Sequence, residues 1–171
     1  MDGPLTTPPE PTRRAAITVE DCLWFVDLAL AQMTALVREL GDDRANRRLD
    51  VAGSNSPYAI LTHCLGVMEF WGGATVAGRA VERDRAAEFV ATGTVDELVR
   101  RAETSRRRLH VDAVVANWEE APSGRAPQGA QEVPYDRSKG AVMLHIVEEL
   151  FQHLGQMEVT RDVLMREGPA S

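Results

Sequence analysis

The stretch that most constrains the fold is a long run near the C-terminus, from Ser138 to Glu167, in which apolar residues recur every three or four positions. Because each residue of an α-helix turns the chain by about 100°, this run predicts one long helix with its apolar side chains on a single face. That face should pack against a core. Glu149 and His153 fall within about 20° of the centre of the same face. A carboxylate in such a position needs a charged or metal partner, because burying it alone is strongly unfavourable.

A second stretch, from Ser56 to Trp71, places His63 at the centre of its own apolar face. The two predicted helices therefore offer three side chains that commonly bind metal ions: His63 from one helix, and Glu149 and His153, one turn apart, from the other. Three protein ligands leave one coordination position for water or substrate, which is typical of catalytic rather than structural zinc sites. We expect one divalent ion there, with zinc preferred and nickel or manganese as alternatives.

The same C-terminal helix carries a further histidine, His145, at the flank of the apolar stripe. It lies about 12 Å along the helix from His153, so the two cannot bind the same ion. We interpret His145 as a residue that orients the ligands or accepts a proton. Glu148 points away from the stripe and is expected at the surface.

Other residues of the second stretch suggest the surroundings of the metal. Gly66 is expected to leave space beside His63, and the aromatic side chains of Phe70 and Trp71 to form walls of a pocket for a bound cofactor. Cys64 turns about 100° away from His63, and we interpret it as a buried thiol rather than a ligand.

Composition and charge exclude several classes of protein. The chain has 171 residues, enough for one complete core, and a formal net charge of −7, which disfavours nucleic-acid binding. No apolar run is long enough for a membrane span and no signal peptide is recognised, so a cytoplasmic location is expected. Its two cysteines do not suggest a disulfide framework there.

The remaining patterns complete an all-α fold, a four-helix bundle with a long crossover loop over 118–137 before the last helix. We expect a flexible arm over residues 1–16 and a single domain over residues 17–171. Helices are predicted to begin near Thr18, Ser56, Thr94 and Ser138.

Glycines and short polar segments are expected to delimit these helices. Gly41 is predicted to end the first helix. The pair Gly72–Gly73 is expected to weaken the second helix near its end, with Gly78 as a further stop, and residues 84–90 are expected to form a short helical turn. The third helix carries a cluster of arginines, which we interpret as a solvated face, with an anion site as the minority alternative. They are Arg100, Arg101 and Arg106 to Arg108.

These motifs resemble those of the DinB-like superfamily of metal-binding four-helix bundles, and within it the thiol-dependent branch of mycothiol-dependent maleylpyruvate isomerases and mycothiol and bacillithiol S-transferases. The resemblance rests on SPYAILTHCLGVMEFW and HIVEELFQHLGQMEVTRDVL. Many members use three histidines, whereas the His, Glu, His pattern of the isomerase-like branch falls on His63, Glu149 and His153. The isomerases carry an additional C-terminal domain that this sequence lacks, so isomerase activity is not expected. Gln156 stands where close relatives often have histidine, which leaves the substrate open.

The resemblance implies an enzyme that transfers a low-molecular-weight thiol, mycothiol in the first instance, to an electrophile. Lys139 is the only lysine, and this arginine bias fits a high-GC, mycothiol-making host. The alternative is a non-catalytic metal-binding stress-response protein of the same superfamily, which a closed fourth coordination position would favour. Partners are expected to be a small-molecule thiol and an electrophile, with no nucleic acid or membrane, and the chain to be a monomer or homodimer.

Overall fold

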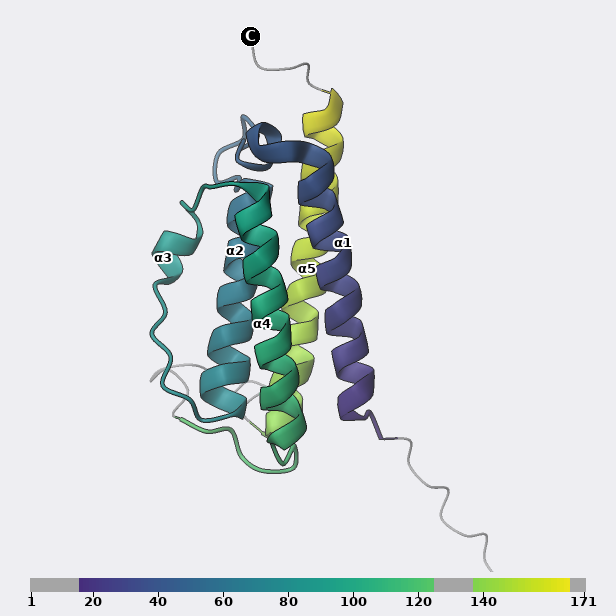
Figure 1. Ribbon diagram of the computed structural model, residues 1–171, viewed down its shortest axis with the longest axis vertical. Helices are drawn as coiled ribbons and strands as arrows, with labels where there is room; N and C mark the ends of the chain where they lie inside the picture. Colours follow the sequence, from purple (N-terminus) through teal and green to yellow (C-terminus); the bar gives the residue numbers. More distant parts are fainter. Residues whose placement is uncertain (1–15, 125–136, 167–171) are drawn as a thin grey trace, which may run out of the picture.

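The computed structural model describes residues 16–124 and 137–166, and all regular structure in these two ranges is helical. The elements are α1 (Val19–Ala45), α2 (Pro57–Val67), η1 (Met68–Val76), α3 (Arg85–Glu88), α4 (Val95–Val115) and α5 (Lys139–Arg166). In Figure 1, α1, α2, α4 and α5 run side by side, and the short α3 lies outside α2 on the segment that leads to α4. The predicted all-α bundle is confirmed. Most of the predicted arm and the middle of the crossover loop lie outside the described residues.

The core is formed by the apolar stripes of the four long helical segments. α1 packs against α4 and α5, and η1 packs against the same two helices. The stripe predicted on the last helix is buried, including Val142, Ile146, Met157 and Leu164, each 0% exposed. None of the described helices combines the length and the apolar content needed to cross a membrane.

The first helix begins as the sequence indicates and is kinked at its expected end. The hydroxyl of Thr18 accepts a hydrogen bond from the backbone N–H of Asp21, and the Asp21 carboxylate accepts one from the backbone N–H of Thr18. This reciprocal capping box fixes the N-terminus of α1. Gly41 has φ +65° and a non-helical conformation, so the first helical run ends there as predicted, and helical residues then resume across a kink as far as Ala45. A left-handed φ is tolerated there because glycine has no Cβ, and the result is a kink.

The second helix widens into a π-helix, η1, which begins at Met68 and includes the glycine pair. The backbone N–H of Ala77 donates to the carbonyl of Gly72 at 3.0 Å, five residues back. A Cβ on Gly72 would overlap the side chain of Leu109, so glycine at this position lets α4 pack closely. The expected stop at Gly78 is confirmed, where φ is +73°. π-helical turns are uncommon and often lie beside functional sites.

An arginine clamp fixes the segment that leaves η1. The Arg79 guanidinium contacts Glu69 on η1 at 2.7 Å and Asp112 on α4 at 2.9 Å. Asp112 is only 6% exposed, so its charge needs this partner. The clamp holds the start of the connection that carries α3 and the residues next to His63.

Candidate metal centre

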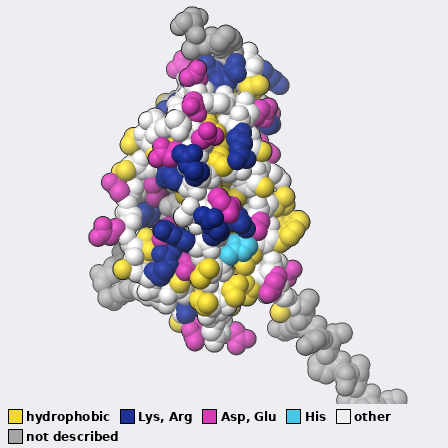
Figure 2. Space-filling model, viewed as in Figure 1, with side chains coloured by type: hydrophobic (Ala, Val, Ile, Leu, Met, Phe, Trp, Pro, Cys, Tyr) yellow, Lys and Arg dark blue, Asp and Glu magenta, His cyan; other side chains and the backbone are white. Residues whose placement is uncertain are grey.

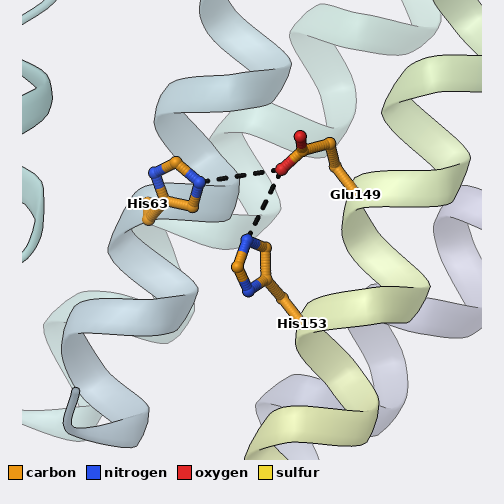
Figure 3. Close-up of side chains that lie close together, drawn as sticks. All are labelled: His63, Glu149 and His153. Carbon is orange, nitrogen blue, oxygen red and sulfur yellow. Dashed lines mark ion pairs between the residues drawn. The ribbon is translucent and has the colours of Figure 1, made fainter. Parts of the chain in front are cut away.

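Two helices bring the three predicted ligands together. His63 projects from α2 toward α5, where Glu149 and His153 lie one turn apart and point back toward it (Figure 3). Glu149 Oε2 lies 3.4 Å from His153 Nε2 and 3.7 Å from His63 Nε2. One ligand atom from each of the three residues lies within 4.8 Å of the other two.

This donor set fits a divalent cation. In a tetrahedral zinc site with bonds of about 2.0–2.1 Å, neighbouring ligand atoms are about 3.3 Å apart. The two distances to Glu149 Oε2 are close to this separation, so small side-chain movements would complete the coordination. The side chains of Glu149 and His153 are 27% and 22% exposed, whereas that of His63 is 4% exposed. The α5 side of the site therefore faces solvent and gives access to a small ligand.

The charges of the site, like its geometry, favour a bound cation. The contacts with His153 and His63 hold the pKa of Glu149 well below its usual range, so this carboxylate is ionised. In return, the contact with Glu149 raises the pKa of His153. The attraction that draws a proton to this pair would also draw a metal ion, since both compensate a partly buried negative charge.

A buried carboxylate that the sequence did not predict supports His63 from behind. Glu88, 8% exposed, is the last residue of the short helix α3, and its Oε2 lies 2.8 Å from His63 Nδ1. Burial raises the pKa of Glu88, but hydrogen bonds from Arg83 and His63 outweigh it and leave the pKa below its usual value. An ionised carboxylate can only accept, so Nδ1 carries the proton and Nε2 is the basic nitrogen on the ligand side.

Arg83 and Phe89 complete this support. Arg83 donates to both carboxylate oxygens of Glu88, at 2.7 and 2.9 Å, and the ring of Phe89 stacks on His63 with centroids 4.6 Å apart. Together they hold the imidazole in one orientation. The sequence predicted a helical turn at 84–90. Nothing in the local pattern indicated that Glu88 faces inward.

Gly66 has a different role from the expected one. A Cβ on Gly66 would overlap the Glu88 carboxylate, so the space beside His63 is filled by that side chain. The room that Gly66 leaves beside His63 is therefore taken by Glu88 and not by a ligand of the metal centre. Glycine is needed here because the Glu88 side chain, held by Arg83, packs directly against the α2 backbone.

On α5, neighbouring residues hold the outer nitrogens of the histidines. Gln156 Oε1 lies 3.0 Å from His153 Nδ1, so the amide at this sequence position supports the histidine ring. His145 Nδ1 lies 3.0 Å from Glu148 Oε2, and its Nε2 lies 3.7 Å from Glu149 Oε1. His145 thus contacts the second oxygen of the central carboxylate and is not one of the three clustered residues.

The two predicted wall residues lie in different environments. The Trp71 ring meets His145 edge to face, with centroids 5.2 Å apart, and so borders the site. Phe70 lies under the guanidinium of Arg83, 5.7 Å from its ring centroid. It therefore contacts the residue that holds Glu88.

Neither cysteine offers a reactive thiol. Cys22 and Cys64 are 1% and 0% exposed and unpaired. Burial raises the pKa of both, and the negative charge of Glu149 adds to this effect at Cys64. A thiolate, if the protein uses one, must come from a bound small molecule.

Residues 22–165 match the family model described as Mycothiol-S-transferase. The matched range includes all three clustered residues and their supporting side chains. The comparison with curated proteins returned no match.

Proposed function

The chain belongs to the mycothiol-S-transferase family, which confirms the resemblance to the thiol-dependent DinB-like branch, and we propose that it conjugates mycothiol to a small electrophile in a divalent-metal-dependent reaction. The observation that carries this proposal is the convergence of His63, Glu149 and His153 at a site open on its α5 side. The protein's own thiols are buried, so the nucleophile is supplied from outside.

We assign a separate role to each side chain of the site. His63, Glu149 and His153 would hold the cation, which would supply the positive charge that stabilises a thiolate at neutral pH. Glu88 and Gln156 hold the outer nitrogens of the two histidines, so both Nε2 atoms present lone pairs to the same point. The partial exposure of Glu149 leaves one side of that point for the incoming sulfur.

In this proposal His145 takes the proton of the thiol. Glu148 accepts from its Nδ1, which leaves Nε2 facing the site as the basic nitrogen. In the reaction, the S–H bond breaks and its proton passes to His145 Nε2. A bond forms between sulfur and the electrophilic carbon, and the leaving group departs with its electron pair. The ring of Trp71 meets His145 edge to face, and the His145 side chain is only 11% exposed.

The direct test is adduct formation with monochlorobimane. Purified protein loaded with zinc, manganese or nickel is mixed with mycothiol, bacillithiol or glutathione, and the fluorescence of the thioether is followed. We expect acceleration with mycothiol that is lost in His63→Ala and in His153→Ala. The matched control is His110→Ala, since His110 pairs with Asp27 between α4 and α1, away from the site. No acceleration with any thiol and metal, over several electrophiles, would favour the non-catalytic alternative.

A further inference from the structure

A cavity lies beyond the metal centre, on the other side of the His63–Glu88 pair. It has a volume of about 480 Å³ and opens between α2, the segment 81–84 and α4. Glu88 forms part of its inner wall, while His63 Nε2 points in the opposite direction, toward Glu149. The cavity is therefore separate from the point where the three clustered side chains meet.

The α4 wall of this cavity is basic and carries hydroxyl groups. Arg100 and Arg101 line it from one turn and Arg108 from about two turns further on, with Thr104 and Ser105 between them. Figure 2 shows Lys and Arg side chains gathered over α4 on the face drawn, with acidic side chains among them. Neither Arg100 nor Arg101 has an ion pair among the described residues. Arg108 reaches Glu69 only at 3.7 Å.

Most of the carboxylates of the lining are already engaged. Glu69 is held by Arg79 at 2.7 Å, and Glu88 by Arg83 at 2.7 Å. Asp84 caps α3 by accepting from the backbone N–H of Ala87 at 3.0 Å. Glu82 and Glu97 also line the cavity, but no ion pair joins either of them to Arg100 or Arg101 among the described residues.

A buried hydroxyl on the opposite wall gives independent support. Thr62 on α2 lines the cavity and is 7% exposed, and its Oγ1 has no hydrogen-bond partner among the described residues. A buried polar group without a partner costs free energy, so such groups are normally satisfied by a ligand or water. Thr62 and the arginines of α4 thus line the same cavity from different helices.

We propose that this cavity binds a small organic anion through a carboxylate or phosphate group. Guanidinium groups suit both, because their paired N–H donors match the oxygens of either anion. The Thr62 hydroxyl adds one donor from the α2 wall. The lining also includes Glu82 and Glu97, which repel a polyanion such as nucleic acid and favour a compact ligand. Such a site matches the minority interpretation of the arginine cluster, and it does not depend on thiol transfer.

The test is calorimetric titration of the full chain with inorganic phosphate and, separately, with succinate, which distinguishes the two anion classes. We expect saturable binding that weakens as sodium chloride is added, since the contacts are ionic. The double variant Arg100→Gln/Arg101→Gln should lower the affinity by about ten-fold or more. Thr62→Val, which keeps the side-chain shape and removes the hydroxyl, should lower it by a smaller factor.

Two controls separate this site from others. Arg107→Gln removes an arginine of the same helix that lies outside the cavity, and it should leave binding unchanged. His153→Ala removes a proposed metal ligand. Binding should persist in this variant, since the anion site is separate from the metal, whereas an anion held by the metal would be lost. No saturable binding of either anion up to millimolar concentration, or equal binding by the double arginine variant, would overturn the proposal. So would loss of binding in His153→Ala.

Discussion

At the scale of single residues, the reactivity of His63 depends on which of its nitrogens carries the proton. Glu88 lies 2.8 Å from Nδ1, and Arg83 keeps that carboxylate ionised and in place. The basic Nε2 therefore faces Glu149 and His153. A histidine on an apolar face usually has its ring nitrogens hydrogen-bonded within the core. In His63 the hydrogen-bonded nitrogen is Nδ1, which faces away from Glu149 and His153.

Replacement of His153 by alanine tests the ligand set directly. We expect one divalent ion per wild-type chain and a large loss of metal in His153→Ala, because two remaining ligands do not hold an ion tightly. Elemental analysis of both proteins after dialysis is the measurement. His110→Ala, which also removes an imidazole, should retain its metal. Equal metal content in His153→Ala and wild type would contradict the assignment.

Replacement of Glu88 by glutamine tests the support behind His63. Glutamine keeps the shape but not the charge, so we expect the affinity for zinc to fall by about 10–100-fold, as is typical when the partner of a ligating histidine is lost. The affinity is measured by competition with a chromophoric chelator. Glu82→Gln is the control, since it removes a nearby carboxylate that does not contact His63 in the structure. An unchanged affinity in Glu88→Gln would show that the hydrogen bond does not tune the ligand.

At the scale of the elements, two helical glycines with opposite surroundings show how closely the site is packed. Gly66 on α2 faces the Glu88 carboxylate, where a Cβ would overlap it. A Cβ on Gly155 of α5 would meet nothing within 4 Å beyond its own helix and chain neighbours. The same substitution should therefore have opposite effects in the two helices.

We expect Gly66→Ala to lower the free energy of unfolding by about 1–3 kcal/mol, because Glu88 is held by Arg83 and cannot move without losing hydrogen bonds. Gly155→Ala should raise it by about 0.5–1 kcal/mol through higher helix propensity. Urea denaturation followed by circular dichroism measures both. A neutral or stabilising Gly66→Ala would mean that Glu88 adapts easily and that α2 does not need glycine there.

At the scale of the whole molecule, the bundle has a core that does not depend on the metal. The four long helical segments bury a continuous apolar cluster that extends well beyond the ligands. Glu149 also has three histidine partners, His63, His145 and His153, without a cation. The metal is therefore expected to add to the stability of the bundle without being required for folding.

Metal removal tests this expectation. Chelation should leave the helical circular-dichroism signal intact at room temperature, unlike in a zinc finger. Metal at about one hundred times its Kd should stabilise the fold by about 2.7 kcal/mol, which corresponds to a rise in Tm of roughly 5–10 °C for a chain of this size. Thermal melts of apo and reloaded protein give both values. Loss of the helical signal on chelation would make the metal structural and would contradict the open-site interpretation.

The sequence by itself determined the features that follow from helical periodicity. The apolar stripes of α1 and α5, the cap of α1 at Thr18 and the stop at Gly78 were predictable because each depends on residues a few positions apart. The same arithmetic placed Glu149 and His153 on a core-facing stripe, and His63 on another.

Only the tertiary structure decided which residues from distant segments meet. Glu88 reaches His63 across 25 positions, and Arg79 reaches Asp112 across 33. The π-helical turn and the filled space at Gly66 also depend on what packs against α2, and the basic cavity forms only where α2 and α4 face each other. Periodicity specifies the face of the helix on which a side chain lies. The residues that contact that face depend on the packing of the whole bundle, in which each buried ionisable group needs a counter-charge.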